Sequence, residues 1–162
     1  MIELAVAASI YLLPQVWEGG CTVTYRIDST ASEYRKAIPW STGQITAVTG
    51  ITFTPTSGPA DITFIQHPKR AIPYPGVHNV IGLWQHETGT VWLTSVAPNT
   101  RRPVALHEVM HALGAAHSPG IDTVMNTEGY GRTAFQQDDL DTLNYIAIQN
   151  GCDHWAGGRW SC

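Results

Sequence analysis

Residues 107–117 read His-Glu-Val-Met-His-Ala-Leu-Gly-Ala-Ala-His and hold the most distinctive chemistry of the chain. On a helix, His107 and His111 lie four residues apart on one face, where two imidazoles can bind one zinc ion. Gly114 lets the chain leave the helix in a left-handed turn, and His117 can return from that turn as a third ligand. Three histidines leave the fourth tetrahedral position to water, which is typical of a catalytic zinc site.

Glu108 directly follows the first histidine, and its position suits a base better than a further ligand. A carboxylate there can polarise a zinc-bound water and later deliver the proton to a leaving amine. A structural zinc site needs a fourth protein ligand, and no other histidine or cysteine has the spacing to supply one. The pattern therefore predicts hydrolysis assisted by one zinc ion.

The strands that must support this site can be read from alternating hydrophobicity. Between the third and the fourth of them, residues 67–79 are rich in proline and glycine and predict a surface loop. The last two strands flank Glu87-Thr88-Gly89 and predict a hairpin. Strands are predicted at residues 21–28, 51–54, 60–66, 80–86 and 90–95.

A first helix is predicted between the first two strands. Thr30 and Glu33 have the spacing of a capping box, and the apolar face that follows continues to Gly50, a natural helix stop. Pro39 and Gly43 interrupt this helix, so the pattern predicts either one kinked helix or two short ones.

Two more helices follow the strands. Asn99-Thr100 can cap the helix that carries the zinc motif, and residues 133–136 form a capping box for a last helix that stops at Gly151. The order is strand, helix, four strands and two helices. This order predicts one α+β domain with a catalytic cleft across it.

Composition and charge narrow the class of protein. The 162 residues are 43% hydrophobic and 14% charged, which is typical of a globular domain and excludes disorder. With a net charge of −4, the chain lacks the excess of positive charge that typically binds nucleic acid or an anionic membrane surface.

The two ends of the chain are interpreted separately from residues 21–150, the predicted catalytic domain. Residues 1–20 form an N-terminal segment in which residues 4–13 resemble the apolar part of a signal peptide, although Glu3 stands where a basic residue is expected. The alternative is an ordered extension with a buried strand or turn. Residues 4–13 are too short to span a membrane, and residues 151–162 form a tail rich in cysteine and tryptophan.

Three cysteines occur, at positions without metal-ligand spacing. A disulfide between Cys152 and Cys162 would close a short loop and leave Cys21 unpaired. A pairing of Cys21 is the alternative, and the sequence alone does not choose between them.

The His-Glu-x-x-His-x-x-Gly-x-x-His stretch resembles the signature of the metzincin zinc peptidases, and Met125 stands where that clan has its Met-turn. Thr127, two residues later, favours the matrixins over the astacins and serralysins, which have a tyrosine there. Val-Thr-Tyr-Arg-Ile, Thr-Gly-Ile-Thr-Phe-Thr, Ala-Asp-Ile-Thr-Phe and Gln-Asp-Asp-Leu, the last at residues 137–140, also resemble matrixin segments. The resemblance covers about residues 21–150.

The resemblance implies a zincin-like fold: a twisted mixed sheet of about five strands with an N-terminal, an active-site and a C-terminal helix. It implies that Met125 lies beneath the zinc as a hydrophobic base. Substrate would lie extended and antiparallel to the edge strand, along Ile81, Gly82 and Leu83. The S1′ pocket would be bounded by the segment from Asn126 to Tyr130. An acidic residue of the last helix can, in this clan, anchor the N-terminus, while Asp138 and Asp139 are interpreted first as complements to the helix dipole.

The resemblance does not extend to the auxiliary metal sites of many animal matrixins. The histidines that would hold a structural zinc are not at their expected points, so His67, His78 and His86 are interpreted as exposed loop residues. One catalytic zinc is expected, and a structural zinc or calcium is not. His154 is likewise expected to be exposed.

The expected function is that of a secreted, monomeric zinc endopeptidase that acts on extended protein or peptide substrates. Nucleic acid and a membrane span are not expected. Two alternatives remain: a zinc-containing module that binds peptides or cell-wall material, which the tryptophans of the tail favour, and a peptidase that acts on a single target. Glu108 argues against the binding module, since binding does not need a base beside the first ligand.

Overall fold

The computed structural model describes residues 10–69, 72–74, 77–126 and 131–152. They form the predicted α+β arrangement, built on a mixed five-stranded sheet in the order β2-β1-β3-β7-β6. Four of the strands are parallel, while β6 pairs antiparallel with β7 at the edge. The strands are β1 (Thr22–Ile27), β2 (Thr52–Pro55), β3 (Ile62–Gln66), β6 (Gly82–Gln85) and β7 (Thr90–Leu93).

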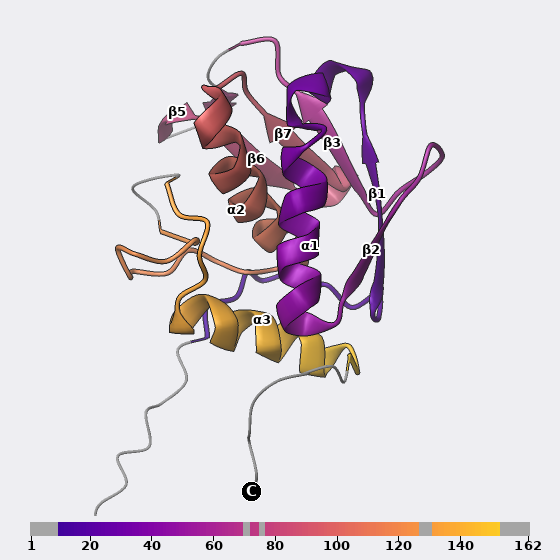
Figure 1. The fold of residues 1–162 in the computed structure, drawn as a ribbon, viewed down its shortest axis with the longest axis vertical. Helices are drawn as coiled ribbons and strands as arrows, with labels where there is room; N and C mark the ends of the chain where they lie inside the picture. The colour runs from indigo at the N-terminus through magenta and orange to yellow at the C-terminus, as the bar shows by residue number, and fades with distance from the viewer. Residues whose placement is uncertain (1–9, 70–71, 75–76, 127–130, 153–162) are drawn as a thin grey trace, which may run out of the picture.

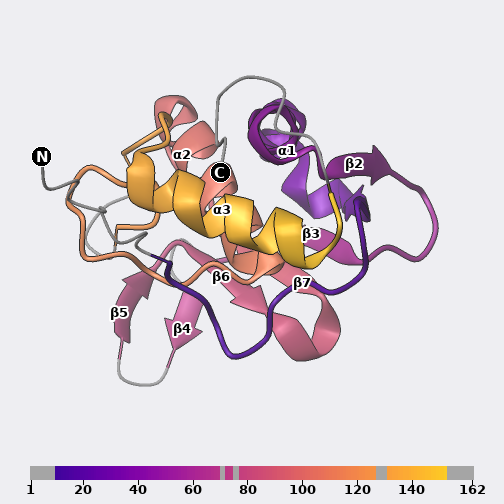
Figure 2. The same ribbon diagram turned by 90° about the horizontal axis from the view of Figure 1, so that it is seen from below.

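Three helices pack against this sheet and against one another. In Figure 1, α1 (Ala37–Thr49) and α2 (Arg101–Leu113) lie side by side across the sheet, and α3 (Gln137–Gln149) crosses their lower ends. Figure 2 shows α3 from below, where it lies across the ends of α1 and α2. The core between the helices and the sheet is fully buried at Phe64, Leu93, Leu106 and Leu143. No helix in the described ranges is long and apolar enough to cross a membrane.

The first helical region is a 3-10 helix followed by one uninterrupted α-helix, so the interruptions predicted at Pro39 and Gly43 are wrong. A 3-10 helix, η1 (Ser29–Tyr34), is followed by α1. The break does not lie at the predicted interruptions, because Pro39 falls in the first turn of α1, where its missing N–H is not needed. The capping box predicted at Thr30 is wrong: Asp28 is the cap, and its carboxylate accepts the Thr30 N–H at 2.9 Å.

The loop predicted at residues 67–79 is wrong in part. It contains β4 (Ile72–Tyr74) and β5 (Val77–Val80), which form an antiparallel two-stranded ribbon. Both strands of a ribbon are edge strands, so the proline inside β4 is tolerated there. The hairpin predicted next is confirmed as β6 and β7, joined by the 3-10 helix η2 (His86–Thr88).

A different pair of residues from the predicted one caps the last helix. Gln136 is the N-cap and Asp139 completes the capping box, whereas Thr133 lies outside the helix. The backbone of Gln136 is extended, and its N–H donates to the Asp139 carboxylate at 2.9 Å. A short polar side chain at the third helical position thus decides where α3 begins. Gly151, with φ of 69°, follows the end of α3 as expected.

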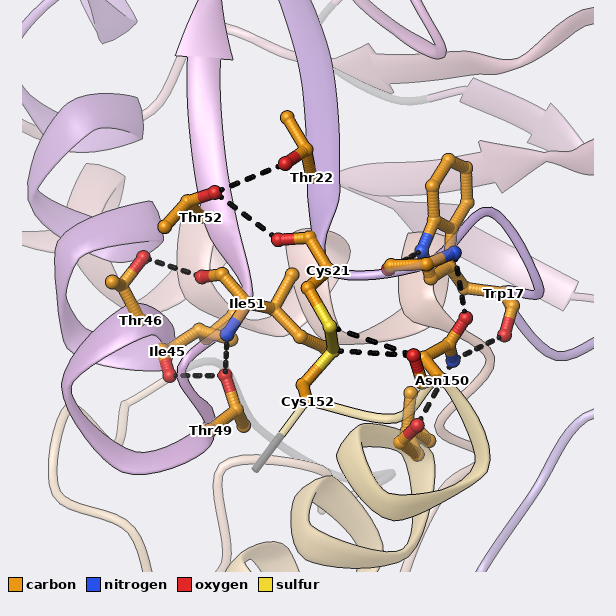
Figure 3. Close-up of a disulfide and its surroundings, with 12 residues drawn as sticks. Trp17, Cys21, Thr22, Ile45, Thr46, Thr49, Ile51, Thr52, Asn150 and Cys152 are labelled. Carbon is orange, nitrogen blue, oxygen red and sulfur yellow. Dashed lines mark hydrogen bonds between the residues drawn. A yellow bond between two sulfur atoms is a disulfide. The ribbon is translucent and has the colours of Figure 1, made fainter. Parts of the chain in front are cut away.

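A disulfide joins Cys21 to Cys152, so the pairing of Cys152 with Cys162 is wrong, and a pairing of Cys21, the alternative, is present. The end of α3 returns to the start of β1, which brings the two Cα atoms to 5.3 Å, within disulfide range. Asn150 supports the same junction, since its amide accepts from Gly20 N–H at 2.9 Å and donates to the Trp17 carbonyl at 2.8 Å (Figure 3). Cys162 lies outside the described residues.

The segment before β1 runs along the end of α2. Leu13 N–H donates to the Gly114 carbonyl at 2.7 Å, and Trp17 N–H donates to the Leu113 carbonyl at 3.0 Å. In return, the Tyr11 carbonyl accepts from Ala116 N–H at 2.9 Å. Residues 11–17 are therefore paired with the turn that leaves the zinc-motif helix.

Candidate metal centre

The helix α2 and the turn that follows it bring the three histidines together. Val109, Met110 and Leu113 are fully buried and anchor the helix in the core. The helix ends at Gly114, which has φ of 104°, a left-handed conformation that favours glycine. A side chain there would also place a Cβ atom 2.6 Å from Cα of Val16. The turn that returns the chain toward the helix therefore depends on glycine.

The imidazoles of His107, His111 and His117 converge on one point. Nε2 of His117 lies 3.2 Å from Nε2 of His107 and 3.1 Å from Nε2 of His111. Zinc–nitrogen bonds of roughly 2.0–2.1 Å in a tetrahedron place ligand nitrogens roughly 3.3 Å apart. The observed spacing fits this value closely, so three nitrogen donors suit a zinc ion in number, kind and separation.

Backbone carbonyls set the tautomer of the two helix histidines. Nδ1 of His107 lies 2.7 Å from the Val124 carbonyl, and Nδ1 of His111 lies 2.7 Å from the Ala115 carbonyl. A carbonyl oxygen can only accept, so each Nδ1 must carry the proton. Each Nε2 then presents its lone pair to the shared point, as outer-sphere partners arrange in metal sites.

The surroundings keep these imidazoles neutral. Burial lowers the pKa of His107 to about 4 and that of His111 to about 3, against an ordinary value of 6.5. Burial also lowers the pKa of His117, the more exposed of the three. Neutral imidazole is the form that binds a metal, so all three are ready to do so at pH 7.

Glu108 lies in the core beside this group and against the edge strand β6. Its side chain is only 1% exposed. A Cβ atom built on Gly82 would lie 2.6 Å from Cδ and 2.7 Å from Cγ of Glu108. The carboxylate can occupy its position only because residue 82 has no side chain.

The other residues predicted for substrate binding lie on two segments. Ile81 precedes β6, and its carbonyl accepts from Thr94 N–H at 3.0 Å, while Leu83 pairs with Trp92 inside the hairpin. Asn126 is buried, and its amide donates to the Gly120 carbonyl at 2.9 Å. Tyr130 lies outside the described residues.

Met125 is 2% exposed and lies in the turn directly after Val124, whose carbonyl holds His107. Asp139, which the sequence interpretation assigned mainly to the helix dipole, supports this turn. Its carboxylate accepts the N–H groups of Val124 at 2.9 Å and Met125 at 3.3 Å. Asp139 therefore fixes the position of a carbonyl that orients a histidine. The only sequence signal for this role was its place in the first turn of α3.

The two other histidines whose side chains are described, His67 and His86, do not add to the centre. Among the described residues, one group of three potential ligands lies within bonding range of a single ion: His107, His111 and His117. His67 packs edge-on against Trp92, and the exposed His86 packs against Trp84. The side chains of His78 and His154 are outside the described set. The expectation on auxiliary metals stays a prediction.

Comparison with known proteins does not extend this result. No protein-family model matches the chain, and no curated protein matches it either.

Proposed function

We propose that this protein is a zinc-dependent endopeptidase of the metzincin type, most similar to the matrixins. The observation that supports the proposal best is the grouping of three imidazoles, with Nε2 of His117 at 3.1–3.2 Å from the other two Nε2 atoms, on a helix that also carries the buried Glu108. A structural site has a fourth protein ligand, and the described residues hold no fourth side chain of this kind near the group. Three ligands and a neighbouring base suit catalysis.

A zinc ion held by the three histidines would supply a Lewis acid for the scissile carbonyl and lower the pKa of water towards about 7. The remaining chemistry belongs to the chain. The Glu108 carboxylate accepts the proton that the attacking water loses and then donates it to the amine nitrogen as the peptide bond breaks. Its contact with Gly82 holds the carboxylate in one place, so little reorganisation is needed before proton transfer.

The edge strand β6 supplies a way to hold substrate. In the described part of the chain it pairs only with β7, so backbone groups of residues 82–85 on its other side are available to an extended peptide. A peptide that adds antiparallel to this edge lies beside Glu108, which contacts the first residue of the strand. Backbone pairing gives affinity with little dependence on sequence, which suits an endopeptidase. Asn126 belongs to the opposite wall in this proposal.

Secretion fits this proposal. The disulfide between Cys21 and Cys152 is a bond that persists in oxidising compartments. We propose that the protein acts outside the cell as a monomer.

The test compares Glu108→Gln with the wild-type protein. The variant should still bind about one zinc per chain and should lose about 10²–10⁴-fold of the rate of casein cleavage, the share typical of a general base. Glu87→Gln is the matched control, because Glu87 is exposed in η2. A Glu108→Gln protein as active as the wild type would contradict the mechanism. Wild-type protein with one zinc that cleaves no generic substrate would favour a single-target peptidase or a binding module.

A further inference from the structure

A cavity of about 810 Å³ lies where η1 and the first turns of α1 and α2 meet. Four of the nine Lys and Arg residues of the chain line it: Arg35, Lys36, Arg101 and Arg102. Glu33 is the one carboxylate among the lining residues. The chain as a whole carries a net charge of −4, so this concentration of positive charge stands apart from the rest of the protein.

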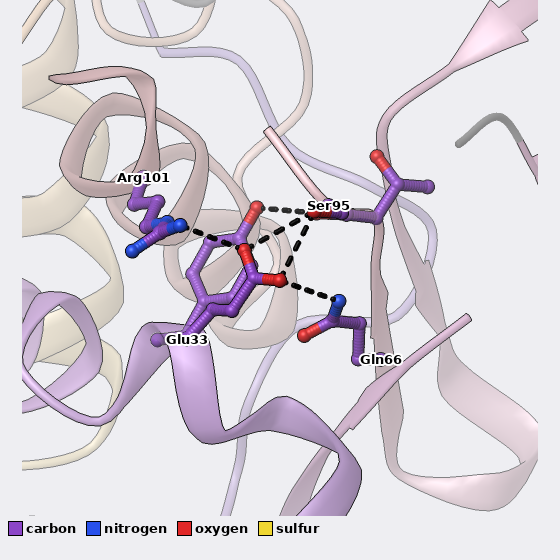
Figure 4. A network of polar contacts seen from close by, with 6 residues as sticks. Glu33, Gln66, Ser95 and Arg101 are labelled. Atoms are coloured by element: carbon purple, nitrogen blue, oxygen red, sulfur yellow. Dashed lines mark hydrogen bonds and ion pairs between the residues drawn. The ribbon is translucent and has the colours of Figure 1, made fainter. Parts of the chain in front are cut away.

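One cation of this cavity, Arg101, already binds a carboxylate of the chain, that of Glu33. Its carboxylate accepts from Nη2 of Arg101 at 2.8 Å, from Oγ of Ser95 at 3.0 Å and from Nε2 of Gln66 at 3.3 Å (Figure 4). The hydrogen bond from Gln66, followed by those from Ser95 and the charge of Arg101, lowers the pKa of Glu33. Glu33 therefore stays ionised and neutralises Arg101.

The other three cations keep their charge available. Arg35, Lys36 and Arg102 are exposed, and no carboxylate of the described residues forms an ion pair with any of them. The Arg102 guanidinium lies 5.0 Å from the centre of the Trp40 ring, a stacking contact that restricts its orientation. Neither α1 nor α2 has an acidic residue in its first turn, so the positive ends of both helix dipoles add to the same field.

We propose that this cavity binds an acidic segment of the protein substrate, with at least two Asp or Glu side chains. Three of the four cations are arginines, whose planar guanidinium groups match carboxylates in a bidentate way. A volume of 810 Å³ is within the range of roughly 300–1,000 Å³ typical of ligand sites. The ion pair between Arg101 and Glu33 shows the same interaction, an arginine with a carboxylate, within the chain.

The cavity lies close enough to the metal centre for one substrate to reach both. A role of the cavity in cleavage rests on the proposed function. Thr133, which lines the cavity, belongs to the segment between Met125 and α3. Arg101 begins α2, six residues before His107, which is about 9 Å along the helix axis. A substrate several residues long spans that distance. Binding of this kind is uniform between ground state and transition state, so it lowers KM and leaves kcat unchanged.

Binding can be tested without catalysis. A fluorescein-labelled hexaglutamate peptide is titrated with Glu108→Gln protein, and its anisotropy is followed at low and at physiological salt. Saturable binding that weakens with salt is expected. Arg35→Ala/Lys36→Ala in the same background should weaken binding by about 2- to 30-fold, the sum expected of two exposed ion pairs. Lys36→Ala should weaken it too, whereas Lys69→Ala, which removes another exposed lysine, should not.

Several results would overturn the proposal. One is the absence of saturable hexaglutamate binding, and another is equal binding by the double variant. Tighter binding of heparin or single-stranded DNA than of hexaglutamate would assign the cavity to a different partner. The kinetic arm compares two substrates with one scissile sequence, with and without an added tetraglutamate flank. A lower KM for the acidic one is expected, and an equal KM would contradict the link to cleavage. A protein that binds hexaglutamate but cleaves nothing refutes only the proposed function.

Discussion

Gly82→Ala tests whether the contact between the edge strand β6 and Glu108 positions the carboxylate for catalysis. The new Cβ would lie 2.6 Å from Cδ and 2.7 Å from Cγ of Glu108, whereas carbon atoms in contact prefer about 3.5–4.0 Å. The carboxylate must therefore move by about 1 Å, because the strand on the other side is held by its pairing with β7. A misplacement of 1 Å in a catalytic group can cost about 10²-fold in rate. We expect a loss of this order in kcat/KM.

The assay measures kcat/KM on a quenched fluorescent peptide, together with zinc content and Tm. Zinc content should stay at about one per chain, since the three atoms nearest to a Cβ on Gly82 all belong to Glu108. Gly82 does not have a positive φ, so the alanine backbone is not itself strained. Gly43→Ala is the matched control, because a Cβ in that part of α1 meets nothing within 4 Å. It should leave kcat/KM unchanged and stabilise the helix by up to about 1 kcal/mol.

Wild-type kcat/KM in Gly82→Ala would refute the reasoning. Loss of zinc from Gly82→Ala would refute it as well, because the contact would then hold the metal centre and not the base.

Three further predictions concern the support of the centre, the disulfide and the protonation of the histidines. Asp139→Ala leaves two backbone N–H groups of the Met125 turn without their acceptor, so the free energy of unfolding in urea should fall by about 2–5 kcal/mol and zinc affinity in chelator competition by about 10–100-fold. Cys21→Ser opens a covalent link across 131 residues and should lower the free energy of unfolding by about 2–5 kcal/mol relative to the oxidised wild-type protein, a loss that reduction of the wild type should reproduce. In the metal-free protein, His107 and His111 have pKa values of about 4 and about 3, below the ordinary 6.5. Between about pH 6.5 and about pH 4 these two histidines bind more protons in the unfolded chain than in the folded protein, so Tm should fall as the pH is lowered through this range. A constant Tm would contradict the burial of these rings.

Local patterns were sufficient for most of the elements. Alternation predicted β1, β3 and the β6–β7 hairpin, since a strand with one buried face leaves a period of two in the sequence. The strand β6, which follows Ile81, also lies at the sheet edge, as the resemblance implied. The errors lie where several local signals compete. Asp28 and Gln136 cap helices that Thr30 and Thr133 were expected to cap, because all of these positions offer suitable polar groups.

The sequence by itself determined the three histidines, the glutamate beside the first of them, and the glycine turn between the second and the third. These residues lie within eleven positions. Helix geometry relates His107 to His111, and the turn at Gly114 returns His117 toward them. Only the tertiary structure decided that Cys21 pairs with Cys152, that Gly82 contacts Glu108 and that Asp139 supports the Met125 turn. Each of these contacts joins separate elements of the fold. Their partners are chosen by how the elements pack together, and no spacing along the chain records that choice.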